Sequence, residues 1–463
     1  MCSKDLMMKL LFCTFFIVFI LGCDDSLQGK FKASISQADP SGKLDTDFSE
    51  DGVVTLDSSA SGSSDDGGKA VAIDSENRIV VTGYSTNLSG NKDMVVWRFL
   101  SDGTLDSTFG TGGAFVQDNA AGGNGDDVGF SVVVASDDSI YVSGYSENAS
   151  NIDELAIWKF TESGVLDTSF NSTGYLTYVH ISSGASEGER GRKIIIDSQD
   201  RVVVLGQGYY TSDKSIKIWR YLSDGTLDTS FSGDGIFEDH GAAGGTGADK
   251  LIWGTIAEDG SIFGAGYSWS GSSVTNHDAV AIKVTSTGDL STDFNSTGIA
   301  THNAAAGADG ADLAYTGFLD LNERFIIAGK STNASTDVEA AVWCYAADGA
   351  LDSGFNGDGI FTLDGIAGAT GSDIINGSAL SDNGSYFFAG KAYNGTDHEM
   401  FVFKLSDEGE LDTQFSEDGI LVYQSGAGSD LAEDLAFDNN GKLIVVGEIS
   451  NGVDSDLAIW RFE

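Results

Sequence analysis

Seven acidic side chains occupy the same position in successive copies of a repeated sequence unit. Each lies near the start of the first predicted strand of its unit, and they are Asp66, Asp127, Glu189, Asp249, Asp312, Asp373 and Asp430. Carboxylate oxygens are ligands for Ca2+, so a ring of them predicts a divalent-cation site. Acidic side chains also accept hydrogen bonds from the backbone of turns, which would make the ring purely structural. The loops contain no dense Asp-x-Asp-x-Asp-Gly run, and both interpretations stay open.

A second set of acidic residues begins the third predicted strand in most units. Its members are Asp93, Glu154, Asp278, Glu339, Glu399 and Asp456. In a sheet of consecutive antiparallel strands, the first and third strands run in the same direction and start on the same side. We therefore expect both sets of acids on one side of the molecule, framed by long loops rich in Gly, Ser, Ala and Asn. This side is called the acidic loop face.

A basic residue follows the tryptophan position of the third strand in six units. These residues are Arg98, Lys159, Arg220, Lys283, Lys404 and Arg461. An aspartate lies one short loop downstream in most of these units, as at Asp106, Asp167, Asp228 and Asp412. Because a carboxylate and a cationic side chain form a charge-assisted hydrogen bond, we predict a structural ion pair in each unit. The fifth unit has Cys344 at this position, which we interpret as a small buried apolar side chain.

The sequence offers little support for an enzyme. Its five histidines share no position between units, and it contains no phosphate-binding loop or Cys/His metal cluster. We therefore assign no catalytic residue. Carboxylates from different units still allow two-carboxylate glycan chemistry. Four aromatic loop residues could stack on a sugar, and they are Tyr209, Tyr210, Trp269 and Tyr393.

The repeated unit itself predicts the fold. A Gly-x-Leu-Asp-x-x-Phe-x-x-x-Gly pattern, with Ser291 once replacing the aspartate, begins at Gly42, Gly103, Gly164, Gly225, Gly288, Gly349 and Gly409. Each unit contains four short apolar runs of strand length separated by turn residues. In the first unit these runs are 69–73, 78–82, 94–99 and 114–117. Seven such units predict an all-β, seven-bladed β-propeller with four antiparallel strands per blade.

The two ends of the repeated region complement each other. After the seventh pattern, the chain supplies one fourth strand and then three further strands, the last of them at 457–462. A suitable fourth strand lies at the other end, at 53–56. We predict that Val53–Leu56 pairs with Leu457–Phe462, so that the N-terminal strand closes the last blade and removes the open sheet edge.

The repeat resembles the bacterial delta-60 repeat family, with its Gly-x-Leu-Asp-x-x-Phe signature and a glycine that ends a strand. The resemblance covers residues 42–463. The glycines expected to end the second strands are Gly83, Gly144, Gly206, Gly266, Gly329, Gly390 and Gly447. A tryptophan follows in the third strand at Trp97, Trp158, Trp219, Trp343 and Trp460. The resemblance implies a β-propeller in an extracytoplasmic setting and implies no activity.

The first residues resemble the signal of a bacterial lipoprotein. Lys9 precedes an apolar run over 10–21, which is too short to span a membrane, because spanning takes about 20 residues. Ile20-Leu21-Gly22-Cys23 resembles a lipobox, in which the cysteine carries the lipid. We predict a lipoprotein signal peptide over 1–22, lipid attachment at Cys23, a polar tether over 23–41 and the propeller over 42–463. The resemblance implies a lipoprotein of the bacterial cell envelope, facing the periplasm or the cell exterior.

Charge narrows the possible partners. The chain has 463 residues and a formal net charge of -45. This charge excludes nucleic acid as a partner, because Lys and Arg supply the affinity for its phosphate groups. We expect a monomer held to a membrane by its lipid. Three functions stay open: a non-enzymatic binding or scaffold module whose acidic loop face takes a protein or polysaccharide ligand, a polysaccharide-acting hydrolase or lyase, and a calcium-dependent adhesin-like surface protein. Ca2+ is the one cofactor that the residues suggest.

Overall fold

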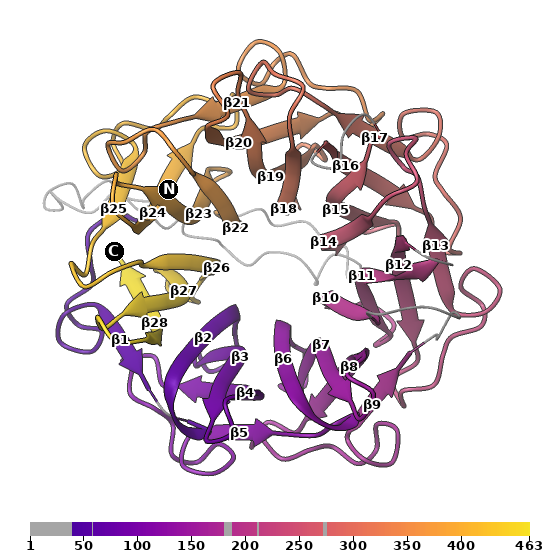
Figure 1. Cartoon of the computed structure of the whole chain (residues 1–463), viewed down its shortest axis with the longest axis vertical. Helices are drawn as coiled ribbons and strands as arrows, with labels where there is room; N and C mark the ends of the chain where they lie inside the picture. The colour runs from indigo at the N-terminus through magenta and orange to yellow at the C-terminus, as the bar shows by residue number, and fades with distance from the viewer. Residues whose placement is uncertain (1–38, 58, 180–187, 211–212, 272–275) are drawn as a thin grey trace, which may run out of the picture. The chain divides into compact units, whose positions relative to one another are not determined.

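Seven four-stranded antiparallel sheets surround a central channel, each sheet forming one blade of a β-propeller (Figure 1). The computed structural model describes residues 39–57, 59–179, 188–210, 213–271 and 276–463. The predicted signal peptide, Cys23 and the tether residues 24–38 lie outside this part of the chain. Within it, no helix has the length and apolar character needed to cross a membrane. The sheets confirm the prediction of an all-β fold with seven blades.

Blades 1 to 4 each consist of four consecutive strands, and the first strand of each blade lies beside the channel (Figure 1). Blade 1 contains β2 (Ser61–Ile73), β3 (Ile79–Asn87), β4 (Lys92–Phe99) and β5 (Ala114–Gln117). Blade 2 contains β6 (Gly122–Val134), β7 (Ile140–Asn148), β8 (Asp153–Phe160) and β9 (Tyr175–Tyr178). Blade 3 contains β10 (Arg190–Ile196), β11 (Val202–Tyr210), β12 (Asp213–Tyr221) and β13 (Ile236–Asp239). Blade 4 contains β14 (Asp249–Ile256), β15 (Ile262–Trp269), β16 (His277–Val284) and β17 (Ile299–His302).

Blades 5 and 6 repeat this arrangement, and blade 7 departs from it. Blade 5 contains β18 (Asp312–Leu319), β19 (Phe325–Thr332), β20 (Val338–Tyr345) and β21 (Ile360–Leu363). Blade 6 contains β22 (Ile374–Leu380), β23 (Tyr386–Tyr393), β24 (His398–Leu405) and β25 (Ile420–Tyr423). Blade 7 takes β26 (Leu431–Phe437), β27 (Leu443–Ser450) and β28 (Ser455–Phe462) from the C-terminal end of the chain, and β1 (Val53–Leu56) from the other end.

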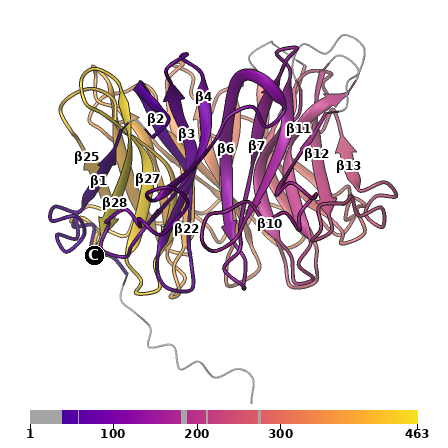
Figure 2. The ribbon, with the colours of Figure 1, turned by 90° about the horizontal axis from the view of Figure 1, so that it is seen from below.

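The ring closes as the sequence predicted. Strand β1 pairs antiparallel with β28, in a register that runs from Val53 opposite Trp460 to Leu56 opposite Leu457. Figure 2 shows β1 and β28 side by side, with the strands running between the two sides of the ring. The chain just before β1 supports the joint, because the backbone N–H of Ser41 donates to the carbonyl oxygen of Glu463 at 2.5 Å. Closure thus removes the open edge that β28 would otherwise present.

The repeated apolar residues form the core between neighbouring blades. The phenylalanines of the repeat and all five repeat tryptophans are buried. Phe109, for example, packs with Val80 of blade 1 and Val142 of blade 2, and Leu105 forms a β-bridge with Phe99. Burying such a side chain contributes about 1.5–3 kcal/mol. The same inter-blade packing therefore explains why Leu and Phe recur in every unit.

The predicted ion pairs are confirmed where the repeat keeps its aspartate. The pairs are Arg98–Asp106 at 2.7 Å, Lys159–Asp167 at 2.9 Å, Arg220–Asp228 at 2.8 Å, Lys404–Asp412 at 2.6 Å and Arg461–Asp45 at 2.8 Å. Where Ser291 replaces the aspartate, Lys283 instead contacts Asp293 at 3.1 Å. Cys344 is fully buried, as predicted.

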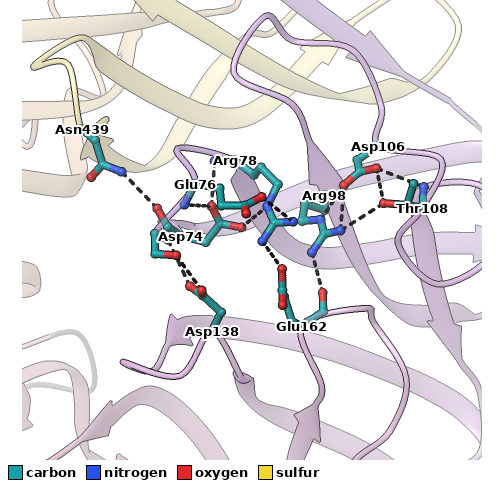
Figure 3. A network of polar contacts seen from close by, with 10 residues as sticks. Asp74, Glu76, Arg78, Arg98, Asp106, Thr108, Asp138, Glu162 and Asn439 are labelled. Carbon is teal, nitrogen blue, oxygen red and sulfur yellow. Dashed lines mark hydrogen bonds and ion pairs between the residues drawn. The ribbon is translucent and has the colours of Figure 1, made fainter.

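These cations also connect one blade to the next. Arg98 donates to the carbonyl oxygen of Glu162 at 2.5 Å, and the Glu162 carboxylate accepts from Arg78 of blade 1 at 2.8 Å. Figure 3 shows both contacts in one network that runs between blades 1, 2 and 7. The ion pairs therefore fix the packing of whole blades as well as the end of each third strand.

Candidate functional site

The predicted ring of seven acids lies at or near the start of the strands that line the channel, except in β2 and β6, where Asp66 and Asp127 lie inside the strand. All seven side chains are buried. The exposed fraction of every one of these side chains is 1% or less. Asp127 accepts from the backbone N–H of Asn119 at 3.0 Å, and Asp312 accepts from Ala304 at 2.8 Å. Asp249, Asp373 and Asp430 accept equivalent bonds from the loops that precede their blades. These carboxylates therefore hold the loops of the acidic loop face in place.

A serine supports the acid in four blades, and sequence reasoning missed it. The serine lies opposite the acid on the second strand, in the pairs Asp66–Ser85, Asp127–Ser146, Asp249–Ser268 and Asp312–Ser331. Each serine hydroxyl accepts a backbone N–H of the preceding loop at 2.8 or 2.9 Å. Burial raises the pKa of Asp127 and of Asp373 to about 6, because desolvation disfavours the charged form.

The second set of acids is held in the same structural way. An asparagine in the loop before the third strand donates to the acid, as Asn87 does to Asp93 at 2.7 Å and Asn148 to Glu154 at 2.9 Å. The Asn87 side-chain oxygen also accepts the backbone N–H of Ser89 at 2.8 Å. The asparagine thus shapes its own turn and fixes the acid beside it.

Only one member of the predicted ring comes close to two other carboxylates within the described part of the chain. Asp66 lies with Asp57 and Asp456, and the nearest carboxylate oxygens of the three all fall within 4.8 Å of one another. This group sits at the joint between blades 7 and 1. The other six ring members have no such pair of neighbours among the described residues, and calcium binding stays a prediction.

Two of the aromatic loop residues pack against glycines of neighbouring loops. The ring of Trp269 covers Gly247, and the ring of Tyr393 covers Gly371, so closely that a Cβ at either glycine would lie 2.6 Å from a ring atom. Tyr209 is 9% exposed, and the side chain of Tyr210 lies outside the described part of the structure. These contacts give Trp269 and Tyr393 a structural role in shaping the loops.

Each strand beside the channel contains a β-bulge, and the extra residue of each bulge lies three positions after the acid. The seven bulge residues are Lys69, Phe130, Arg192, Ile252, Tyr315, Asn376 and Glu433. All seven are half-buried, although most of their chain neighbours are fully buried. A bulge turns a side chain away from the regular alternation of a strand. Every blade therefore presents one side chain of its own to the channel.

The repeated glycines explain the bulges and correct one prediction. Gly83 and its equivalents do not end the second strands, because β3 continues to Asn87 and the other second strands likewise run on. Each glycine lies opposite the bulge, where a Cβ would meet a carbonyl oxygen of the first strand at 1.8 to 2.0 Å, as at Gly83 with Gly67. Only glycine leaves room for the bulged strand to approach so closely.

The seven bulge residues line one cavity of about 360 Å3 inside the ring of blades. We call these seven residues the channel ring. Figure 1 shows the strands that carry them, β2, β6, β10, β14, β18, β22 and β26, surrounding the central channel. Lys193, Trp253, Tyr267 and Asp434 also line the cavity. No two channel-ring residues are of the same type, whereas the packing positions of the repeat are nearly constant.

Charges in the channel are divided between two sides. On the side of blades 7 and 1, Lys69 contacts Glu433 at 2.6 Å and Glu448 at 2.9 Å. Asp434 accepts from the backbone N–H groups of Val71 at 3.1 Å and Leu435 at 2.9 Å, and burial raises its pKa. These acids are therefore already engaged in holding blade 7 and blade 1 together.

On the side of blades 2 to 4, cations lie beside aromatic rings. The Arg192 guanidinium lies 4.1 Å from the centre of the Phe130 ring. The Lys193 ammonium lies 5.8 Å from the centre of the Trp253 ring. Burial and the neighbouring charge of Arg190 lower the pKa of Arg192 to about 10. The channel thus has an engaged acidic side and an aromatic, positively charged side.

The residues that the repeats share do not include the channel ring, because its members differ in every blade. The sequence nevertheless contains an indication of this ring. Three residues after each recurring acid, the sequence changes completely from unit to unit within an otherwise regular pattern. Variation at one fixed position of a repeat indicates a position that packing does not constrain.

Four segments of the chain match the family described as "Domain of unknown function (DUF5122) beta-propeller", over residues 75–109, 135–170, 200–231 and 324–355. No curated protein sequence matches the chain. The crystal structure of polysaccharide lyase Uly1 is similar, with a TM-score of 0.50 and 11% sequence identity, covering 86% of this chain and 90% of that chain.

Two further solved structures show lower scores. A glucose dehydrogenase has a TM-score of 0.41 at 11% identity, covering 88% of this chain and 99% of that chain. A protein of unknown function from Dyadobacter fermentans has a TM-score of 0.45 at 10% identity, covering 89% of this chain and 97% of that chain. At identities this low, structural similarity shows the fold alone. The chain is therefore a repeat protein with the β-propeller fold, while the delta-60 and lipobox assignments stay predictions.

Proposed function

We propose that this protein is a non-enzymatic binding module of the bacterial cell envelope that holds a saccharide in its central channel. The channel ring carries the proposal, because seven bulges aim seven different side chains into one cavity. Its volume of about 360 Å3 falls within the range of about 300–1,000 Å3 that is usual for small-molecule sites. The backbone bulge recurs in every blade, whereas the side chain that it carries differs from blade to blade.

The lining of the cavity fits a sugar. Phe130, Trp253 and Tyr315 supply flat apolar surfaces, while Ser131 and Asn376 offer hydrogen-bonding groups between them. Ligand sites combine mostly apolar walls with a few polar groups that fix orientation. A pyranose ring presents the same combination, with C–H groups on its faces and hydroxyls around its edge.

The acidic loop face is less suited to the ligand than the channel. Inner carboxylates of this face accept hydrogen bonds from the backbone of the preceding loops, as described above, and all seven are buried. For this reason the proposal places the ligand in the channel, although the sequence alone favoured the acidic loop face.

The setting of the protein rests on the sequence. Ile20-Leu21-Gly22-Cys23 resembles a lipobox, and we propose that Cys23 carries a lipid that holds the protein at a membrane, facing the periplasm or the cell exterior. Replacing Cys23 by Ser should move the protein from the membrane fraction to the soluble fraction. Equal membrane association of both forms would contradict lipid anchoring.

Binding by the channel can be tested with the full-length protein in detergent. Isothermal titration calorimetry against a panel of oligosaccharides should detect binding that Tyr315→Leu weakens, since Tyr315 belongs to the channel ring. Tyr423→Leu is the matched control, because Tyr423 lies on the outer strand β25 beside Trp460. Binding that neither variant changes, or that Tyr423→Leu weakens as much, would contradict the proposal.

The same titrations separate the other two functions. Release of shortened or unsaturated products would identify a hydrolase or lyase. Binding only in the presence of Ca2+ would identify the adhesin-like alternative and would direct attention to Asp57, Asp66 and Asp456. The proposal expects unchanged saccharide and no calcium requirement.

A further inference from the structure

We infer that the saccharide bound in the channel carries a carboxylate, and that the Arg192 guanidinium binds it. This inference rests on the proposed function and names the chemical class of its ligand.

Arg192 is the exception among the arginines of this protein. The chain contains eight arginines, and seven of them contact a carboxylate within 2.8 Å, namely Arg78, Arg98, Arg190, Arg201, Arg220, Arg324 and Arg461. In the described part of the chain, Arg192 forms no such pair, and its buried Nε has no hydrogen-bond partner. In a chain with a net charge of -45, carboxylates are abundant, so a half-buried arginine without a carboxylate partner is unusual.

A buried charge without a partner is unfavourable, and the burial that lowers the pKa of Arg192 expresses this cost. Two neighbouring cations leave the positive charge of Arg192 without a counterion. Arg190 is already paired with Asp153 at 2.5 Å. Lys193 adds a second positive charge, which interacts with the Asp434 carboxyl but has no carboxylate within ion-pair distance among the described residues. An anion entering the channel would satisfy both cations at once.

The orientation of the guanidinium favours a planar carboxylate. The Cζ atom of Arg192 lies 4.1 Å from the centre of the Phe130 ring, a cation–π contact that restricts where the guanidinium can lie. A guanidinium matches a carboxylate through two parallel hydrogen bonds. Trp253, beside Lys193, lies on the same side of the cavity and can cover the face of the attached sugar ring.

The opposite side of the channel fixes the direction of the ligand. On blade 7, Glu433 is paired with Lys69 and Asp434 accepts backbone hydrogen bonds, so this side offers a carboxylate no free cation, whereas its oxygens can accept hydrogen bonds from hydroxyls. The ligand should therefore lie with its carboxylate toward blade 3 and its hydroxyl edge toward blade 7. A uronic acid unit has this distribution of groups.

The experiment compares a uronate with its neutral ester on matched variants. Calorimetric titration of the full-length protein uses digalacturonate and its methyl ester, in which a methyl group on each carboxyl removes the negative charge. Wild-type protein should bind the acid at least about tenfold more tightly than the ester, and Arg192→Gln should remove that preference, as expected for a charge-assisted hydrogen bond. Arg201→Gln is the control, because Arg201 is on the same blade but outside the channel. This variant should bind both ligands like wild type.

The outcomes distinguish this inference from the proposed function. Equal affinity for acid and ester, with both weakened by Tyr315→Leu, would leave a saccharide site and overturn the role of Arg192. Inorganic sulfate that competes as strongly as digalacturonate would show an anion site without a sugar preference and would also overturn the inference. Absence of binding by any saccharide would overturn both the inference and the proposed function.

Discussion

Two arginines of blade 3 should respond in opposite ways to the same substitution. Arg220 contacts Asp228 at 2.8 Å, donates to the Ser286 carbonyl of the next blade at 2.6 Å and lies over Phe231 at 4.5 Å. Its side chain is 3% exposed. Arg192 has the cation–π contact with Phe130 but no carboxylate partner in the described structure. Methionine has a similar length and no charge, so Arg220→Met and Arg192→Met isolate the value of the ion pair.

The expected size of the effect follows from burial. Removing one partner of a buried ion pair costs about 3–5 kcal/mol, because the other charge is left without compensation. With an unfolding entropy of about 2.1 cal/mol/K per residue over ~420 propeller residues, this corresponds to a fall in melting temperature of roughly 3–6 °C for Arg220→Met. Arg192→Met leaves no orphaned carboxylate and removes an uncompensated charge, so its melting temperature should equal or exceed that of wild type.

Differential scanning calorimetry of wild type and both variants at one pH measures these shifts. A melting temperature of Arg220→Met that matches wild type would refute the structural role of the repeated ion pairs. A fall for Arg192→Met as large as that for Arg220→Met would show that Arg192 has an energetic partner, and the reasoning about the channel would be wrong.

Three further predictions follow from the fold. Gly329→Ala places a Cβ 2.0 Å from the Leu313 carbonyl oxygen, so it should destabilise the protein by several kcal/mol (about 3 or more). Gly307→Ala has no atom within 4 Å of its Cβ and adds only the backbone strain of a φ of 83°, about 1–2 kcal/mol; equal urea midpoints of the two variants would contradict the role of the bulge. Burial raises the folded-state pKa of Asp127 from 3.8 to about 6, so the folded state binds more protons and this group's contribution to stability is lost as pH rises from about 4 to about 6; the melting temperature of Asp127→Asn relative to wild type should rise over that window, and a constant difference would refute it. Deleting residues 1–56 removes β1 and exposes the edge of β28, so size-exclusion chromatography should show aggregation, and a monomer with the wild-type melting temperature would contradict ring closure.

The sequence predicted the features that every blade needs. Leu105 and Phe109 recur because the packing between blades is the same at each junction, and Arg98 and Asp106 recur for the same reason. Ring closure by Val53–Leu56 followed from counting strands. The apolar run 69–73 nevertheless marked only part of β2, which begins at Ser61, because its polar residues continue the ladder without contributing to the core.

The residues of the proposed binding site were harder to predict, because they differ between units whereas the repeat shows only what the units share. Asp127 recurs and therefore drew attention, yet its recurrence reflects a loop that every blade must hold. Gly144 was assigned to the end of a strand, since glycine often interrupts strands, and its role opposite the bulge depends on the register between two strands. Phe130 and Arg192 differ from blade to blade, because a binding site inside a symmetric ring must break that symmetry.

The most direct test of the account is a crystal structure of the full-length protein with digalacturonate bound. The account predicts that the ligand lies in the channel, with a carboxylate within hydrogen-bond distance of the Arg192 guanidinium and a sugar ring against Trp253. Electron density for the sugar on the acidic loop face, with the channel free of ligand, would contradict it.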